Sequence, residues 1–302
     1  MLIVAAFYHF TPMPDYAAHR AALSALAMDN GVTGTILLAE EGVNGTIAGS
    51  RDGIDAMLGA LRALPGCAAL EHKESAAADP PFKRMKVRLK KEIVTMGAAV
   101  DAANDAGVYV DPGDWNALIE DPDVILVDAR NHYEIGIGRF EGAIDPETES
   151  FSELPEWLDA LAAKTDKKKI AMYCTGGIRC EKSTAYAKRL GFDEVYHLKG
   201  GILKYLEVTP PEQSLWRGEC YVFDGRVSVG HGLTQGAYEL CGACGLPIAD
   251  ADKSHPDFEL GVSCHQCIDL YSDNQRERFR HRQYQIELAA ARGRDHFKDG
   301  GR

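Results

Sequence analysis

The sequence has no apolar run long enough to cross a membrane. None of its 302 residues belongs to a stretch near the roughly 18 consecutive apolar residues that a membrane-spanning helix needs. Residues 1–10 are apolar, but they lack a basic flank and a small-residue cleavage site, so they predict a first strand rather than a signal peptide. We therefore expect a cytoplasmic protein with no membrane partner.

The chain also lacks the cysteine density of a disulfide-rich protein and the positive charge of a general nucleic-acid-coating protein. Eight cysteines in a chain of this length do not make a disulfide scaffold, and their clustering indicates thiol chemistry and a metal in a reducing compartment. The net charge of −12 argues against general nucleic-acid binding. An apolar content of 45% is enough for two or three packed domains.

The first part of the chain, residues 1–97, predicts a ferredoxin-like α+β domain. Its periodicity alternates as strand, helix, strand, strand, helix, strand, which makes two βαβ units. A turn-rich segment at 40–44 joins the second and third strands. The expected strands are 2–10, 34–39, 45–48 and 84–94, and the expected helices are 15–30 and 54–64.

A basic strip follows the last of these strands. Basic residues at 86, 88 and 90 alternate with two apolar residues, so the cations should share one face while the apolar side chains face the core. The strip is either a solvated strand face or a patch that contacts the phosphates of RNA. Its six cations, with no acid between them, are Lys83, Arg84, Lys86, Arg88, Lys90 and Lys91.

The middle of the chain predicts an α/β domain at 113–215, after a linker at 98–112. A short helix at 115–120 precedes three buried strands, at 124–128, 170–173 and 194–198, with helices between them. In such a parallel sheet, reactive groups collect at the carboxyl ends of the strands. At these ends we expect a salt bridge that either braces the Cys174 loop or, as we favour, is purely structural, and two histidines in packing or polar networks. The residues concerned are Asp128 with Arg130, and His132 with His197.

The most informative segment of the chain runs from Cys174 to Arg179, directly after the second buried strand. The N-terminus of the helix expected at 181–190 and the N–H groups of the loop would face the sulfur, which favours the thiolate. The loop glycines allow a tight curl, and Arg179 adds a fixed positive charge. A buried structural cysteine is the alternative. The residues of the expected cradle between the two ends are Thr175, Gly176, Gly177 and Ile178.

This loop resembles the active-site loop of the rhodanese family, in which the residue that matches Cys174 carries sulfur as a persulfide. The loop has six residues, whereas the related cysteine-based phosphatases use one more, so a phosphatase is less favoured. Segments 128–143 and 198–202 also resemble rhodanese segments. The resemblance covers about residues 112–210 and implies a rhodanese-like fold with a parallel sheet.

Residues 216–302 predict a cysteine-rich module followed by a helix at 273–292. Two CxxC pairs, separated by 19 residues, supply the four thiolates of a structural zinc site. A redox dithiol pair or two disulfides are the alternatives, and His265 is not needed as a ligand. The four arginines at 276–282 are spread around their helix, so a solvated helix and an RNA contact are both open. The expected ligands are Cys241, Cys244, Cys264 and Cys267, while Cys67 and Cys220 are expected to be buried thiols.

The whole layout resembles the bacterial family of rhodanese-domain tRNA uridine hydroxylases. The resemblance rests on the turn Glu41-Gly-Val-Asn-Gly45, the Cys174 loop with its Cys180-Glu-Lys extension, and the cysteine-rich tail. It implies oxygen-dependent conversion of the wobble uridine of tRNA to 5-hydroxyuridine. Under that resemblance tRNA is the partner, molecular oxygen the co-substrate, and a sulfur or electron donor protein fits as a further partner. The spacing shows no two-His-one-carboxylate set and no organic cofactor motif.

Several chemical readings of the loop stay open. Cys174 acts either as a nucleophile on C6 of the uracil ring or as a persulfide, with Arg179 stabilising developing charge. Cys180 either resolves an oxidised Cys174 or simply begins the helix, and we expect the second. The alternative functions are a thiosulfate-type sulfurtransferase and an RNA-binding scaffold with a redox-sensing cysteine.

Overall fold

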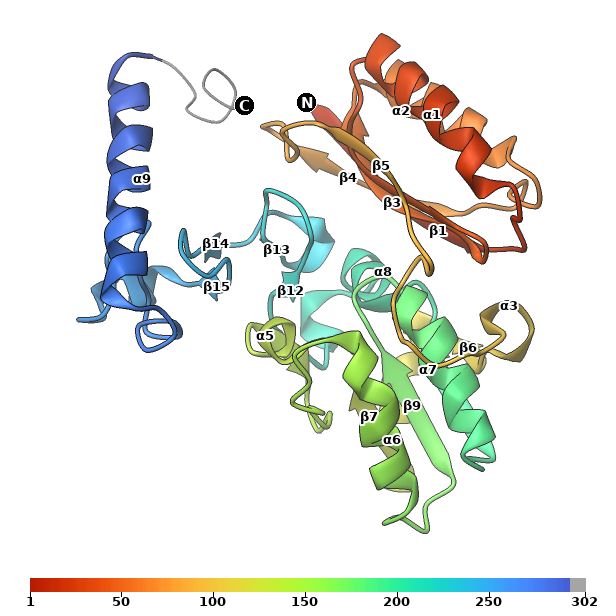
Figure 1. The fold of residues 1–302 in the computed structure, drawn as a ribbon. Coiled ribbons are helices and arrows are strands. Elements are labelled where there is room, and N and C mark those ends of the chain that lie inside the picture. The colour runs from red at the N-terminus through yellow and green to blue at the C-terminus, as the bar shows by residue number, and fades with distance from the viewer. Residues whose placement is uncertain (294–302) are drawn as a thin grey trace. The chain divides into compact units, whose positions relative to one another are not determined.

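The computed structural model describes residues 1–293, and the chain forms two compact units. The first unit contains residues 1–225 and 229–235, and the second contains 226–228 and the described residues from 236 onward (Figure 1). No helix within the described residues is long and apolar enough to span a membrane.

The first unit begins with a mixed five-stranded sheet in the order β4-β1-β3-β2-β5. Neighbouring strands are antiparallel except β5, which runs parallel to β2. The βαββαβ core confirms the predicted ferredoxin-like domain. Its elements are β1 (Leu2–Phe10), a 3-10 turn (Tyr16–Ala18), α1 (His19–Asp29), β2 (Thr33–Ala39), β3 (Gly42–Gly49), α2 (Arg51–Arg62) and β4 (His72–Ala77), followed by β5 (Met85–Leu89).

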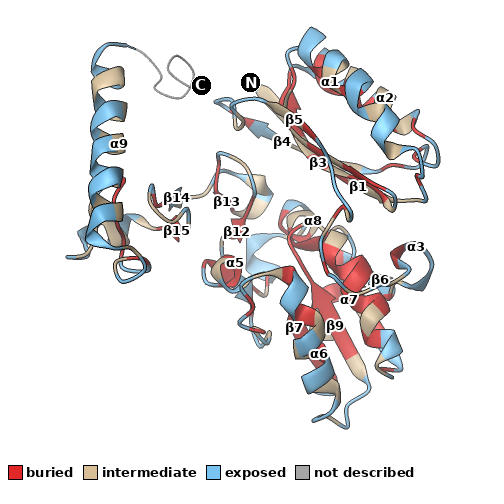
Figure 2. Ribbon diagram, viewed as in Figure 1, coloured by how far each residue is buried: buried red, intermediate tan, exposed pale blue. Residues whose placement is uncertain are grey.

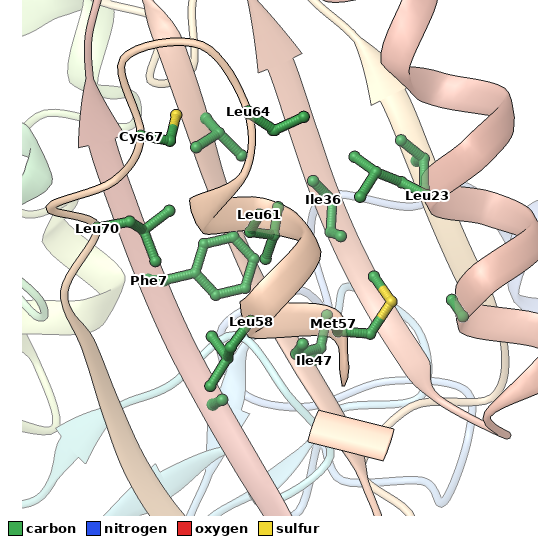
Figure 3. Packing of buried hydrophobic residues seen from close by; sticks show 14 of the residues in the cluster. Phe7, Leu23, Ile36, Ile47, Met57, Leu58, Leu61, Leu64, Cys67 and Leu70 are labelled. Atoms are coloured by element: carbon green, nitrogen blue, oxygen red, sulfur yellow. The ribbon is translucent and has the colours of Figure 1, made fainter. Parts of the chain in front are cut away.

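Two helices, α1 and α2, cover one face of this sheet (Figure 1). The alternating apolar residues of the strands meet the apolar face of α2, and Figure 3 shows Phe7 and Ile47 packed against Met57 and Leu58. The α2 helix starts at a capping residue, since the Ser50 hydroxyl accepts a hydrogen bond from the N–H of Gly53 at 3.2 Å.

The prediction of the last strand was partly wrong. The strand that completes the βαββαβ core is β4, whose polar sequence HKESAA shows no apolar alternation. The predicted strand at 84–94 is shorter, and as β5 it lies at the sheet edge. Leu89 is 38% exposed there, so Val87 is the buried core residue of this strand and Met85 packs against the same core partly buried. The turn predicted at 40–44 is also shorter, because β3 begins at Gly42.

The second domain of this unit has a parallel four-stranded sheet in the order β6-β10-β9-β7, as predicted. Strands β7 and β9 are buried (Figure 2), with one core under α6 and α7 and another under α4 and α8. The elements are β6 (Val108–Val110), α4 (Pro112–Ile119), β7 (Val124–Asp128), α5 (His132–Ile135), β8 (Gly138–Phe140), a 3-10 turn (Phe151–Glu153), α6 (Leu154–Ala162), β9 (Lys169–Tyr173), α7 (Ile178–Arg189), β10 (Glu194–Leu198) and α8 (Gly201–Val208).

The boundaries of this domain differ from those predicted. The expected linker at 98–112 contains α3 (Ala102–Asp105) and β6, which pairs with β10. The domain also continues past residue 215, because β11 (Trp216–Gly218) pairs with β8 and buries Trp216 in the core. The remaining short elements are 3-10 turns at Pro211–Gln213 and His231–Leu233, and strands β12 (Cys220–Tyr221) and β13 (Ser228–Val229).

The second unit is small and has few apolar residues to bury. It contains β14 (Glu239–Leu240) paired with β15 (Pro247–Ile248), a 3-10 turn (Asp250–Ser254) and α9 (Asp273–Ala291). No residue of α9 is buried (Figure 2). The arginines of α9 are used within the unit: Arg280 pairs with Glu259 through two hydrogen bonds of 2.7 Å, and Arg282 donates to the Gly261 carbonyl at 3.0 Å. These contacts favour an anchored, solvated helix.

Candidate active site and metal centre

Cys174 lies at the end of β9, where the chain turns into α7. Its side chain is fully buried, and its Sγ accepts a hydrogen bond from the N–H of Gly177 at 3.1 Å. Gly177 has φ of 108°, a value that suits glycine, and it is the residue that caps the helix. The segment from 174 to 179 therefore curls around the sulfur as the sequence predicts.

The surroundings of Cys174 stabilise its thiolate. Burial raises the pKa of Cys174, but hydrogen bonding by the Cys180 thiol, the positive charge of Arg179 and the N–H groups of Cys180 and Gly177 outweigh it, and the pKa falls to about 5. At neutral pH the sulfur is therefore a thiolate, which is the nucleophilic form of cysteine.

Cys180 takes a larger part in the site than the sequence indicates. We expect it only to begin the helix, but its buried thiol forms a hydrogen bond with Cys174. Burial, followed by this hydrogen bond, raises the pKa of Cys180 well above its ordinary value. Cys180 is thus a neutral donor next to an anionic sulfur.

A Cys180→Ala variant should raise the pKa of Cys174 above its value of about 5, because the thiolate loses the donor that lowers its pKa most. Cys180→Ser keeps a hydroxyl donor and should leave the pKa close to that of the unmodified protein. Titration of the thiolate by its ultraviolet absorbance measures the midpoint. The same titration of a Cys174→Ala variant gives the contribution of the other cysteines, which is subtracted. Equal midpoints for the Ala and Ser variants would contradict the assigned role.

Arg179 is held by a buried carboxylate that is not among the predicted site residues. Its guanidinium forms a two-pronged pair with Glu134, with Nη1–Oε1 and Nη2–Oε2 distances of 2.5 and 2.8 Å. Nη2 also donates to the Thr175 hydroxyl at 3.2 Å, so the arginine is tied to the loop. The only sequence signal for Glu134 is its place three residues after Asn131, as in a helix capping box.

The predicted Asp128–Arg130 pair forms and is fully buried. Arg130 Nε and Nη2 lie 2.9 and 2.6 Å from the two Asp128 carboxylate oxygens. Arg130 also donates to the carbonyls of Glu134 and Gly138, at 3.1 and 2.6 Å. The pair therefore holds α5 in place, and it supports the Cys174 loop through the Glu134–Arg179 pair.

The segment at 198–202 supports the loop from the other side. The N–H groups of Ile202 and Leu203 donate to the carbonyls of Cys174 and Thr175, each at 3.0 Å. A Cβ on Gly201 would lie 2.5 Å from the Cys174 carbonyl oxygen, so only glycine allows this approach. This close approach explains why glycine stands at position 201.

Two residues of the first domain contact the loop, and no motif in the sequence predicts either contact. Lys73, on β4, donates from Nζ to the Gly176 carbonyl at 2.9 Å. Tyr8, on β1, donates its hydroxyl to Glu181 at 2.8 Å and lies 2.7 Å from where a Cβ of Gly177 would be. Both contacts join segments that are far apart in the chain, so no local pattern in the sequence predicts them.

Lys182 joins the start of α7 to the first domain. Its buried Nζ lies 2.8 Å from Glu41 and 2.6 Å from Glu92. Glu41 also accepts the N–H of Ile93 at 2.6 Å, and Asn44 donates to the Ile93 carbonyl at 2.9 Å. The turn motif at 41–45 and the extension at 180–182 therefore belong to one buried contact.

The remaining predicted residues have structural roles. His197 is buried, its ring centroid lies 4.3 Å from that of Tyr109, and burial lowers its pKa to about 4. His132 is half exposed and forms a 2.8 Å pair with Asp145. Cys67 and Cys220 are fully buried thiols, as predicted.

Four cysteines of the second unit converge on one point that could hold a metal ion. The sulfur atoms of Cys241, Cys244, Cys264 and Cys267 all lie within 4.8 Å of one another. Three of the pairs are 3.6, 3.9 and 4.0 Å apart, close to the edge of about 3.8 Å in a tetrahedron with 2.3 Å metal–sulfur bonds. His265 is outside the cluster, and its Nδ1 lies 3.8 Å from Asp252.

The basic strip borders a shallow groove of about 310 Å³ beside α1. Arg84, Lys86 and Arg88 line it together with Arg20, which is not among the predicted residues because it lies on α1, outside the strip. Within residues 1–293, no carboxylate pairs with these four side chains. Lys86 and Arg88 alternate with the buried Val87 on β5, as predicted, whereas Lys90 and Lys91 follow the strand and are exposed.

The fold and the cysteine loop define a rhodanese-like protein with an additional N-terminal domain. Residues 111–207 match the rhodanese-like domain family, and residues 2–93 match the UPF0176 acylphosphatase like domain family. Over nearly its full length the chain is similar to curated proteins named tRNA uridine(34) hydroxylase. It is 58% identical to that of Agrobacterium fabrum over 295 residues, covering 97% of this chain and 94% of the relative. It is also 58% identical to that of Ruegeria pomeroyi, covering 98% and 99%. The chain belongs to the tRNA uridine(34) hydroxylase family.

Solved structures are similar to single domains of the chain. The rhodanese-like domain of an Anabaena protein is 21% identical, covers 36% of this chain and 78% of that one, and gives a TM-score of 0.30. An acylphosphatase from Coxiella burnetii is 18% identical, covers 28% and 90%, and gives a TM-score of 0.23. The family membership therefore rests on the full-length relatives.

Proposed function

We propose that this protein hydroxylates the wobble uridine of tRNA at C5, with molecular oxygen as co-substrate and Cys174 as the essential residue. The observation that carries the proposal is the buried thiolate in its cradle, in a chain 58% identical over nearly its full length to proteins named for this reaction. The reaction takes place in the cytoplasm, where tRNA is modified, and the four-cysteine centre holds zinc in a structural role.

The chemistry of the site fits attack by sulfur on the uracil ring. Addition of the Cys174 thiolate to C6 forms an Sγ–C6 bond and moves the C5=C6 electron pair toward C5 and the C4 carbonyl, which makes C5 electron-rich. The loop N–H groups and the Arg179 charge surround the sulfur, so they stabilise the thiolate that attacks and that is regenerated when the product leaves. Molecular oxygen supplies the atom that bonds to C5, and its second atom leaves as water with two protons and two electrons from an electron donor protein.

Mass spectrometry of tRNA nucleosides from a deletion strain tests the proposal. Complementation by the unmodified gene should restore 5-hydroxyuridine, and Cys174→Ala should not. Cys67→Ala, which removes a buried thiol from the core of the first domain, serves as the control and should restore it. Full modification by the Cys174→Ala variant would refute the assignment. A purified protein that passes sulfur to cyanide, from a strain with unchanged tRNA, would instead indicate a sulfurtransferase.

We expect the groove beside α1 to bind the phosphates of tRNA. A variant with reversed charge at Lys86, Arg88 and Lys90 should bind tRNA more weakly by about a factor of ten or more. Its binding should also depend less on salt, because each lost phosphate contact no longer releases counterions. Binding measured over a range of salt concentrations tests this, with reversal of the exposed Lys188 on α7 as the control. Unchanged affinity and salt slope would show that the strip is only a solvated face.

A further inference from the structure

Two glutamates beside the Cys174 loop lie in opposite environments. Burial raises the pKa of Glu134, but the Arg179 guanidinium outweighs it and the pKa is lowered, so this carboxylate is a fixed anion. Glu181 has no cation within salt-bridge distance among the described residues. Burial raises the pKa of Glu181, and the phenol hydrogen bonds only partly offset it. Carboxylates whose environments separate their pKa values in this way are typical of a division between charge support and proton transfer.

The contacts of Glu181 hold it at the Cys174 loop. It follows Cys180, the residue whose thiol and N–H face Cys174. Its oxygens accept one hydrogen bond each, from Tyr8 at 2.8 Å and from Tyr109 at 2.7 Å. Tyr8 in turn lies over Gly177, whose N–H is bonded to the Cys174 sulfur. Two phenols fix the carboxylate in position without neutralising it.

The proposed reaction needs a proton acceptor at this place. Once oxygen is attached to C5, the ring is joined to Cys174 through C6, and C5 still carries its hydrogen next to the C4 carbonyl. Release of product requires that the C5–H bond and the Sγ–C6 bond both break. The electron pair of C5–H then forms the C5=C6 bond, and the pair of Sγ–C6 returns to sulfur as thiolate.

We propose that Glu181 is the general base that takes the C5 proton while the Cys174 sulfur leaves C6. The proton moves to the Glu181 carboxylate, the thiolate is regenerated in its cradle, and no further oxidant or reductant is consumed in this step. This inference rests on the proposed function. It also gives the first domain a part in the chemistry, since Tyr8 positions the base.

The test is the state of Cys174 in a Glu181→Gln variant that complements a deletion strain in air. Glutamine can still bond to both phenols but cannot accept the proton. We expect 5-hydroxyuridine to fall by about a factor of a hundred. We also expect the variant to accumulate as a covalent adduct, in which the Cys174 peptide carries a hydroxylated uridine after denaturing purification and nuclease digestion. Glu156→Gln, on the exposed face of α6, is the matched control and should behave as the unmodified protein.

The outcomes separate this inference from the proposed function. Adduct accumulation in Glu181→Gln, and none in a Glu181→Gln, Cys174→Ala double variant, supports it. Loss of 5-hydroxyuridine without an adduct would overturn it, because Glu181 would then have only a structural role. Unchanged 5-hydroxyuridine in Glu181→Gln would overturn it as well, while loss of the nucleoside in Cys174→Ala would leave the proposed function standing. Full modification by Cys174→Ala would refute the function itself.

Discussion

A Glu134→Gln variant should be about 3–5 kcal/mol less stable than the unmodified protein, because it leaves the Arg179 guanidinium buried without its counterion. The Arg179 side chain is only 8% exposed and that of Glu134 is fully buried, so water cannot replace the lost carboxylate. For a unit of this size the loss corresponds to a fall in melting temperature of roughly 10 °C. Thermal and denaturant unfolding, followed by circular dichroism, measure it.

The control for this change is Glu141→Gln. Glu141 pairs with Arg217 at 3.2 Å, but the two side chains are 70% and 62% exposed, so we expect a loss of less than about 1 kcal/mol. Similar losses for both variants would contradict the assigned role of Glu134.

The pH dependence of the unfolding free energy gives a second check on Glu134. The folded pKa of Glu134 is lowered, so its contribution is present above the ordinary carboxylate range and is lost as pH falls through the lowered value.

Removal of the metal should unfold the second unit. The fully buried members of its small apolar cluster are Ile248 and three of the four cysteines, so little else can form a core. Zinc in a four-cysteine site contributes roughly 10–16 kcal/mol of apparent binding free energy at neutral pH, far more than this cluster can supply. After chelation, or in a Cys264→Ser variant, we expect metal loss and rapid proteolysis confined to residues 236–293.

Metal analysis of the purified protein decides the identity of the ion, and we expect one zinc per chain. His265→Ala is the matched control, because this residue lies within the second CxxC pair but outside the cluster, and it should keep the metal. Full resistance to protease after complete metal removal would exclude the structural role. A pair of disulfides in the purified protein would favour one of the alternatives raised by the spacing.

Local patterns in the sequence were sufficient for the parts of the site that are close together in the chain. The cradle from Cys174 to Arg179 is contiguous, and each CxxC pair places two thiolates on one turn, so spacing alone predicts both sites. The buried parallel strands are visible as continuous apolar runs. The sequence does not predict strand β4, because this segment is polar and lacks alternation, and the more regular pattern of β5 predicts the last core strand instead.

The contacts that join distant segments could not be predicted in this way. Glu134 and Arg179 are 45 residues apart, and Tyr8 and Glu181 are 173 apart. Nothing in the local pattern of Tyr8, on a strand with ordinary alternation, distinguishes it from a core tyrosine. Cys180 shows the same limit at short range, since its helical position does not reveal that its thiol faces Cys174.

Four successive residues of α7 contact four different sets of partners, and this affects any experiment on an excised domain. Arg179 is bonded to the loop, and Cys180 lies against the sulfur of Cys174. Glu181 accepts hydrogen bonds from two tyrosines, and Lys182 pairs with the carboxylates of Glu41 and Glu92. A fragment limited to the rhodanese-like match at 111–207 would lack Tyr8, Tyr109 and both carboxylates. Its cysteine would be held differently from that of the intact chain. Sulfurtransferase assays on such an excised fragment would therefore report on a loop without its native supports.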